Sequence, residues 1–462
     1  MLHSSTSSSC NSSSDIETQM GTKEISAIIK LLASRSAKVA TMLRENQMEE
    51  AAVMMRRIPS LFGSKAFKEV IRFCNGNCSK LLSCDNVIPI ACLAKFLDMS
   101  ENQSKNNLIS LSLIFFKHNV LSSWSNTIKA LKSTAFLVQP ASKLGFIEDC
   151  VEALIDKACA NPCLLESSDE ALATLPLKLF EPIIHAMQES RVEPSYVASS
   201  VIKFATHYVD SKEAVEAVER MIPEGNGLIP TTIMFRMLKE AMRFNVSSVC
   251  RHAFERRIAK QLRAAKVDDL MLICELEKGI ESVKRMLNMF FSGLKVTKDE
   301  IVSVGELMEE FLIVISRDER LTMGEFVALA EASKVATAVK RGSSDGIYKA
   351  LNGYLENHGD LAEEERVEVC KVLEIGRLSE EATEHAAVNT KLPERIVMQV
   401  MFAEMRRRDA LAGEFERREE SLEGERKVGV WKGMKRKLRC GSIEDCEREV
   451  LIKKKRKGLC SR

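Results

Sequence analysis

GIYKALNGYLENHGDLAEEERVEVCKVLEIGRLSEEATEHAAVNTKLPERIVMQVMFAEM, residues 346–405, is the stretch that decides the fold class of this chain. Three short helical patterns follow one another in it, and each has its own start and stop signals. The first places Tyr348, Leu351 and Leu355 on one face, because side chains three and four residues apart are neighbours on a helix. Gly359 ends this first pattern.

The two later patterns begin at capping residues. Asp360 stands three residues before Glu363, the spacing at which a side-chain oxygen caps a helix start while the glutamate reaches back. Ser379 predicts the start of the third helix, with Glu380 in the first turn, where the helix dipole favours a negative charge. Pro393 suits the first turn of a further helix.

An ordered set of residues in this stretch carries a family resemblance: Tyr348, Ala350, Tyr354, Leu355, His358, Glu365, Arg366, Cys370, Leu378, Ser379, Glu381, Ala382, His385, Ala386, Ala387, Asn389, Leu392, Pro393, Arg395, Val400 and Phe402. The set resembles the signature of the plant phototropic-response (non-phototropic hypocotyl) domain, whose members are BTB/POZ proteins. The family usually has proline at Gly359 and serine at Ala362. We expect Asp360 to take over the capping that Ala362 lacks.

The N-terminal part resembles the later half of a BTB/POZ domain. The matching residues are Phe73-Cys74-x-Gly76, Asn86-Val87-Ile88, Cys92, Leu97-x-Met99, Asn107-Leu108-Ile109, Val120-Leu121 and Ser123-Trp124. Leu31 to Lys38 resembles the helix that follows the opening hairpin of that fold, and the hairpin has no counterpart here. Ala52 to Met55 reads as one short strand. The module is therefore expected to be either degenerate or truncated.

Composition favours helix throughout, since Pro and Gly are few and hydrophobic content is 45%. The predicted fold is mainly α, with a degenerate BTB/POZ-like α(+β) module followed by an all-helical bundle or irregular solenoid. The expected divisions are a disordered tail, the partial BTB/POZ-like module, a helical linker, the phototropic-response helical domain, and a charged helix extension with a basic tail: 1–22, 23–135, 136–170, 171–412 and 413–462.

Enzyme motifs are absent from the sequence, so we predict a protein without enzymatic activity, cofactor or metal. It has no glycine-rich phosphate loop, nucleophile elbow or zinc-binding helix motif. The spacing of its 14 cysteines indicates neither disulfides nor zinc and favours buried, reduced thiols. His385 stands beside two alanines, which suggests packing or capping rather than catalysis.

Two features remain open. Tyr348 and Tyr354 are two of only four tyrosines; their rings either pack in a helix interface or serve modification or partner contact. The last 36 residues contain 13 Lys/Arg against 4 Asp/Glu, a net charge of +9, with two clusters. Such clusters are typical of nuclear import signals and of segments that attach to an anionic membrane. Nucleic-acid binding would also need aromatic platforms, which this tail lacks. The clusters are Lys435, Arg436, Lys437, Lys453, Lys454, Lys455, Arg456 and Lys457.

The resemblance, rather than periodicity, implies the function. It suggests a substrate-specific adaptor of a cullin-type BTB E3 ubiquitin ligase that recruits a target protein for ubiquitination. The alternative is a signalling scaffold, without ligase activity, in plant light and auxin responses at the plasma membrane. Implied partners are a cullin scaffold, an unknown target, a receptor kinase, a homo- or hetero-dimer partner and an anionic membrane, but no nucleic acid. The expected location is cytoplasmic and plasma-membrane associated, with the nucleus as alternative.

Overall fold

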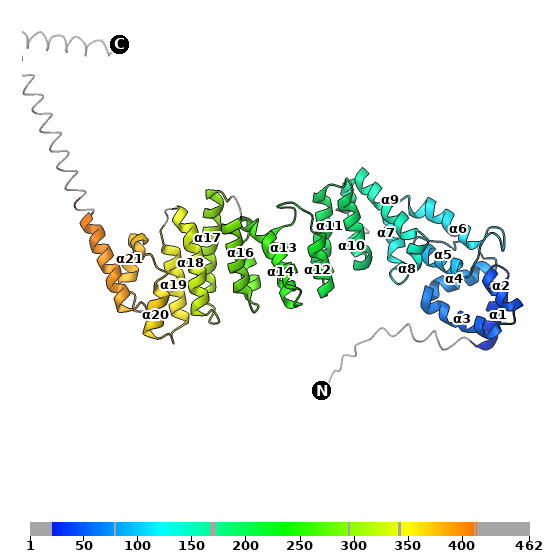
Figure 1. Cartoon of the computed structure of the whole chain (residues 1–462), viewed down its shortest axis with the longest axis horizontal. Helices are drawn as coiled ribbons and strands as arrows, with labels where there is room; N and C mark the ends of the chain where they lie inside the picture. The colour runs from blue at the N-terminus through cyan, green and yellow to red at the C-terminus, as the bar shows by residue number, and fades with distance from the viewer. Residues whose placement is uncertain are drawn as a thin grey trace, which may run out of the picture. The chain divides into compact units, whose positions relative to one another are not determined.

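Apolar stripes at helical spacing become helices throughout the residues that the structure describes. The computed structural model describes residues 21–77, 80–166, 172–293, 296–340, 343–410 and 413. No strand occurs among them, and the prediction of a mainly α protein is confirmed. Contacts divide the chain into an N-terminal unit, Met1–Val296, and a C-terminal unit, Thr297–Arg462 (Figure 1). The division falls inside the predicted domain 171–412, and the predicted domain boundaries stay predictions.

The first part of the N-terminal unit packs around one helix that is buried on almost every side. This helix, α5, carries eight buried residues, from Val87 to Ala94, and contacts α3, α4, α6 and α8. A helix that is apolar all round must be enclosed by others. The helices here are α1 Thr22–Ala33, α2 Ala37–Arg44, α3 Met48–Phe62, α4 Ser64–Cys74, α5 Val87–Phe96, α6 Leu108–Phe115, the π-helix η1 Phe116–Val120, α7 Trp124–Lys132, α8 Val138–Lys143, α9 Phe146–Ala160 and the 3-10 helix η2 Pro162–Leu165.

The predicted strand at Ala52 to Met55 is wrong, because these residues lie inside α3. Ala51, Met55 and Ile58 are buried on one side of this helix, and their spacing of four and three residues suits a helix. A four-residue apolar run cannot distinguish strand from helix by itself. The strand of the predicted degenerate BTB/POZ module therefore does not form. Of the predicted disordered tail, residues 1–20 lie outside the described residues, and α1 begins at its last residue, Thr22.

The second part of the N-terminal unit is a stack of helices. From α10 to α14, each helix contacts the one that lies two places further along the chain, and most also contact the next. This pattern is that of stacked helical hairpins and agrees with the predicted bundle or solenoid. The elements are η3 Leu172–Thr174, α10 Leu177–Glu189, α11 Pro194–His207, α12 Lys212–Met221, α13 Thr231–Arg243, α14 Ser248–Ala259, η4 Leu262–Ala264, α15 Val267–Cys274 and α16 Gly279–Gly293.

A buried ion pair ties α14 to α16 in this stack. Glu255 is fully buried, and Arg285 donates two hydrogen bonds to its carboxylate, of 3.0 and 2.7 Å. A charge taken out of water is tolerated only where a partner compensates it. The bidentate arginine supplies that compensation and sets the register of the two helices.

The C-terminal unit begins with α17, against which α18 and α19 both pack closely (Figure 1). Gly346 and Gly353 of α19 are seven residues apart and face α17, where they meet Glu309 and Ser316, also seven apart. A Cβ atom on Gly346 would lie 3.1 Å from the Glu309 Cβ. The elements are α17 Lys298–Ile315, α18 Met323–Lys340, α19 Asp345–Asn357, α20 Glu363–Cys370, η5 Ile375–Arg377 and α21 Glu380–Ala387, and residues 394–410 are helical.

This close approach predicts a large cost for a side chain at Gly346. We expect Gly346→Val to lower the unfolding free energy of the C-terminal unit by about 1–3 kcal/mol, the usual range for overpacking. Hydrogen exchange of the α17 and α19 amides, followed by mass spectrometry, measures the change. Gly324→Val is the matched control, since Gly324 is also the second residue of a helix and has open space around it. Equal protection in both variants would contradict the prediction.

Candidate functional site

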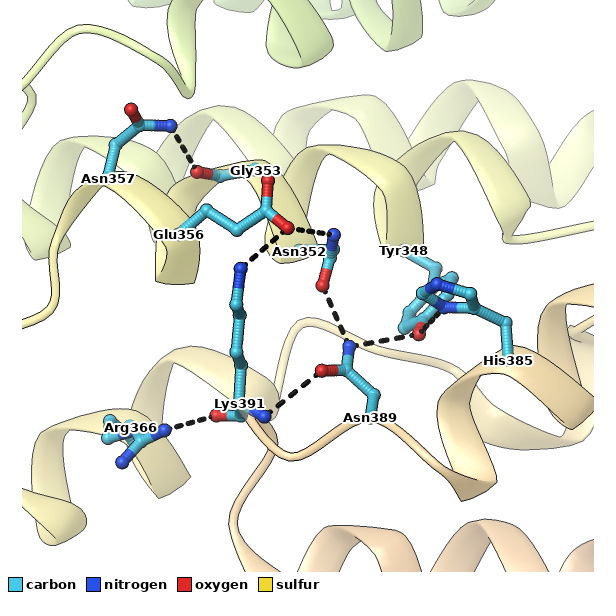
Figure 2. Close-up of polar contacts among 9 residues, drawn as sticks. All are labelled: Tyr348, Asn352, Gly353, Glu356, Asn357, Arg366, His385, Asn389 and Lys391. Atoms are coloured by element: carbon cyan, nitrogen blue, oxygen red, sulfur yellow. Dashed lines mark hydrogen bonds and ion pairs between the residues drawn. The ribbon is translucent and has the colours of Figure 1, made fainter.

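The candidate site is a polar cluster on one face of α19, where that helix meets α20, α21 and the turn 388–392 (Figure 2). Tyr348, Asn352 and Glu356 follow one another at intervals of four residues. Side chains at this spacing lie on the same face of a helix, so α19 presents one polar edge to the elements that follow it in the chain.

Tyr348 lies at the centre of the first half of the cluster. Its ring is 3% exposed, and its hydroxyl hydrogen-bonds to Nδ1 of His385 on α21 at 2.6 Å. Asn389 Nδ2 donates to the same hydroxyl at 3.2 Å. Burial raises the pKa of Tyr348, and the hydrogen bond from Asn389 opposes that rise. The phenol is therefore held neutral as a bridge between α19 and α21.

Asn389 connects the two halves. Its Nδ2 also donates to the Asn352 Oδ1 at 2.7 Å, and its Oδ1 accepts from the Lys391 N–H at 3.0 Å. Both ends of the amide are thereby satisfied, as a half-buried asparagine requires. Asn389 thus fixes the turn after α21 against α19 (Figure 2).

Charged groups close the other half of the cluster. The Lys391 ammonium lies 2.7 Å from the Glu356 Oε1, and Asn352 Nδ2 donates to the same oxygen at 3.1 Å. The hydrogen bond from Lys391 lowers the pKa of Glu356. Arg366 of α20 donates to the backbone carbonyl of Lys391 at 2.5 Å. The turn 388–392 is therefore tied to both α19 and α20.

The second tyrosine lies elsewhere on α19. Tyr354 is 1% exposed, and its ring stacks between Phe326 and His358, with centroid distances of 4.5 and 3.9 Å. Its hydroxyl donates to the Leu321 carbonyl at 3.3 Å. The burial of Tyr348 and Tyr354 agrees with the packing interpretation of both rings, and a role in modification or partner contact stays a prediction.

The start of α21 follows the sequence prediction, and the start of α20 does not. Ser379 caps α21, with its side chain accepting from the Ala382 N–H at 3.2 Å. In α20 the N-cap is Ala362, whose N–H donates to Glu365 at 3.0 Å, so the predicted cap at Asp360 is wrong. The intervals 360–363 and 362–365 are the same length, and the local pattern alone does not choose between them.

Asp345 holds the beginning of α19 to the cap of α21. Its carboxylate accepts a hydrogen bond of 3.0 Å from the Ser379 N–H, and the Ser344 N–H donates to the Arg377 carbonyl at 2.9 Å. Burial by itself would raise the pKa of Asp345, but hydrogen bonds from Ser379 and Ser343 bring it below the ordinary value. The carboxylate therefore stays ionised and acts as a clamp.

Sequence reasoning found part of this cluster. Tyr348, His385 and Asn389 all stand in the family signature, but their mutual contact was not predicted. Asn352, Glu356 and Lys391 were missed. The available signal was the spacing of four residues between Tyr348, Asn352 and Glu356. The predicted basic clusters, Lys435 to Lys437 and Lys453 to Lys457, lie outside the described residues.

The cluster is arranged for packing, with its polar groups paired to one another. Among the described residues, no group of three or more His, Cys, Asp or Glu side chains could hold a metal ion. The same part of the chain contains no helix long and apolar enough to cross a bilayer. Two hollows, of about 480 and 350 Å³, are lined by residues of the N-terminal unit and by none of the cluster.

Several cysteines are buried within the helical packing. Burial raises the pKa of Cys92 and of Cys370 to about 12, and it raises the pKa of Cys150 as well. Thiols with such pKa values are protonated at neutral pH and are poor nucleophiles. The predicted buried thiols are confirmed at these three positions, whereas Cys159 and Cys163 are exposed.

Comparison of the sequence with known proteins identifies related chains. The NPH3 family model matches residues 167–383, a span that includes Tyr348 and Tyr354 and ends two residues before His385. BTB/POZ domain-containing protein At3g03510 of Arabidopsis thaliana is 38% identical over 404 residues, which cover 83% of this chain and 78% of that protein. BTB/POZ domain-containing protein At5g17580 of the same plant is 35% identical over 442 residues, which cover 86% and 80%. No solved structure matches the chain.

The hydrogen bonds of Tyr348 predict the effect of removing its hydroxyl. We expect Tyr348→Phe to destabilise the C-terminal unit by about 0.5–1.5 kcal/mol, because His385 and Asn389 both lose a partner. Hydrogen exchange of the amides in the turn 388–392 reports the loss. Tyr208→Phe is the matched control, since that ring is 44% exposed.

The same substitution has a pH signature. The pKa of Tyr348 is raised in the folded protein, so its contribution to stability is complete below the unfolded pKa of about 10 and is lost as pH rises through the folded pKa. Tyr348→Phe should therefore reduce the alkaline loss of stability. An unchanged alkaline profile would argue against the raised pKa.

Burial and pKa together predict which thiols react. With iodoacetamide at mildly alkaline pH, Cys159 and Cys163 should be alkylated in the native protein, while Cys92, Cys150 and Cys370 should react only after unfolding. Peptide mass spectrometry measures each position. Native-state labelling of Cys92 at the rate of Cys159 would contradict the packing described for α5.

Proposed function

The chain belongs to the NPH3 family of plant BTB/POZ proteins, and from this premise we propose that it is a substrate-specific adaptor of a cullin-type E3 ubiquitin ligase. The N-terminal module, 23–135, would dock the cullin scaffold. The helical domain, 171–412, would recruit the target protein for ubiquitination. A second copy or a related chain would pair through the N-terminal module.

The observation that carries the proposal is the similarity to a BTB/POZ protein over 78% of that protein's length. The arrangement of helices supports it, since stacked helical hairpins leave extended faces that bind other proteins. In the C-terminal unit, the polar cluster around Tyr348 fixes α19, α20 and α21 in one arrangement, and its groups are engaged with each other. The proposed activity is therefore recognition, without bond-making chemistry.

A second candidate is a signalling scaffold without ligase activity, in light or auxin responses at the plasma membrane. The feature that favours it is the net charge of +9 over residues 427–462, which suits an anionic membrane surface. A receptor kinase would be its partner, and import into the nucleus is the other use of the same charges. The two candidates place the protein in the cytoplasm or on the membrane.

A binding experiment separates the two candidates. We expect the full chain to retain a purified cullin N-terminal domain in a pull-down and to support ubiquitination of a bound target in a reconstituted assay. Loss of cullin binding, with association to anionic vesicles or a receptor kinase retained, would eliminate the adaptor proposal and leave the scaffold.

A matched pair of surface variants sharpens this experiment. Ile114 of α6 is 58% exposed in the N-terminal module, and Val249 of α14 is 78% exposed in the helical stack. If the module docks the cullin through α6, Ile114→Arg reduces the cullin retained by about tenfold or more, the effect of a charge placed in a buried contact. Val249→Arg should leave cullin retention unchanged. Equal retention in both variants would remove α6 from the docking surface.

A further inference from the structure

A basic recess of about 350 Å³ lies in the stack of helices, where the end of α14 meets the loop between α12 and α13. Arg256, Arg257 and Lys260 line it from the side of α14. Arg256 and Lys260 stand four residues apart and share one face of the helix, since Lys260, the C-cap, keeps right-handed helical backbone angles. Ala253, one turn earlier, also lines the recess, and its small side chain leaves space beside the cations.

The charges around the basic recess do not cancel. Arg257 pairs with Glu219 of α12, with 3.5 Å between the guanidinium nitrogen and the carboxylate oxygen. The side chains of Arg256 and Lys260 form no ion pair or hydrogen bond with another described residue. One further acid lines the recess, Glu224, which is exposed and forms no ion pair with a described residue either. Two unpaired cations against one unpaired acid leave the recess with a net positive charge.

The loop between α12 and α13 supplies hydrogen-bond donors to the basic recess. The amide N–H groups of Gly225 and Asn226 form no hydrogen bond with another described residue, and both residues line the recess. Gly225 has φ +140°, a conformation that residues with a side chain rarely adopt. Successive free N–H groups in a turn are a common cradle for anions. The recess thus combines cationic side chains with backbone donors.

Cations at the end of a helix have an ordinary explanation, because they stabilise the negative end of its dipole. That explanation covers their presence on α14. It does not cover the hollow beside them or the free donors on a different loop. The combination suits a phosphate monoester, which brings three acceptor oxygens and a charge of about −1.5 to −2 at pH 7, and whose oxygens the guanidinium of an arginine binds in pairs.

The walls of the basic recess indicate how such a phosphate would arrive. Pockets for small molecules enclose most of the surface of their ligand and are lined mainly by apolar side chains. Here the lining residues Glu224, Gly225, Asn226, Arg256 and Lys260 are all exposed, so a ligand is held at one end and stays open to solvent at the other. A phosphorylated side chain that projects from a longer chain matches this shape.

We propose that the basic recess binds a phosphorylated serine or threonine of a partner protein. Arg256 and Lys260 hold the phosphate, and the N–H groups of Gly225 and Asn226 complete its set of donors. Glu224 repels the same phosphate and weakens the complex. The inference rests on the proposed function, in which the helical domain recruits a target, and it names phosphorylation as the mark by which that target is recognised.

Peptide retention tests the proposal with the full chain. The probes are three immobilised peptide libraries of degenerate sequence around one fixed residue, which is phosphoserine in the first, serine in the second and glutamate in the third. We expect the phosphoserine library to retain about tenfold more protein than either of the others, because only the phosphate offers three oxygens and a charge near −2. Raised salt should weaken this retention, since the cations are exposed and screened.

Matched variants locate the binding. Arg256→Gln and Lys260→Gln should each lower the retention by the phosphoserine library about tenfold, the loss of a hydrogen bond to a charged group. Glu224→Gln should raise it, because a repulsive charge is removed. Lys212→Gln is the control, since Lys212 is an exposed cation at the start of α12 that does not line the recess, and it should retain the wild-type level. Circular dichroism checks the helix content of every variant.

The pH dependence of retention gives a second readout. The second pKa of a phosphate monoester is about 6, so lowering the pH from about 7.5 to about 5 removes part of its charge and should weaken binding. No histidine lines the basic recess, and the loss therefore follows the phosphate. Hydrogen exchange with a peptide selected from the library should show protection of the amides at 224–227 and 256–261.

Each contrary outcome overturns the proposal. Equal retention by the phosphoserine and serine libraries does so, as does equal retention by the glutamate library, which would assign the recess to acidic peptides in general. Wild-type retention in both Arg256→Gln and Lys260→Gln places the binding elsewhere. Competition by inorganic phosphate at the same concentration as a selected peptide would make free phosphate the ligand. Cullin retention, measured separately, reports on the adaptor proposal, so a chain that keeps the cullin but ignores phosphopeptides removes only this inference.

Discussion

The structure depends on one constraint: most of its short helices bury one apolar stripe against the helices nearest to them in the chain. Contacts between a helix and the one or two that follow it recur from α10 to α16 and again from α17 to α20. Such packing makes stability largely a sum of neighbouring interfaces. It also makes each interface demanding: where α17 approaches α19, a Cβ atom on Gly346 would lie only 3.1 Å from the Glu309 Cβ.

Two groups of polar side chains pair across this packing, and the pairs set the register of the helices. Glu255 and Arg285 hold α14 to α16, while Tyr348, His385 and Asn389 hold α19 to α21 and to the turn after it. A buried polar group without a partner costs about 1–3 kcal/mol, so each of these contacts selects one arrangement of helices over its alternatives. The titratable side chains of these two groups therefore serve to hold the helices in place.

In a rigid helical protein, the surface side chains that no neighbouring helix covers are the ones available to a partner. In the N-terminal unit, Val53 and Leu61 of α3 and Ile114 of α6 are apolar and exposed, and no strand of a BTB/POZ sheet forms among the described residues there. The adaptor and scaffold proposals both place function at such surfaces. They differ in the partner, which surface chemistry selects through apolar contact at the centre and charge at the edges.

The sequence by itself determined the helical class, the family, the cap at Ser379 and the end of α19, because apolar spacing and capping act within about four residues. It misplaced the cap of α20 at Asp360 and misassigned Ala52 to Met55, where short patterns fit two structures equally well. Only the tertiary structure decided that Tyr348 meets His385 and Asn389, 37 and 41 residues further along the chain. It alone also decided which apolar side chains of α3 face the core and which remain exposed to solvent. These outcomes depend on which helices meet, and that is settled by the packing of the whole unit.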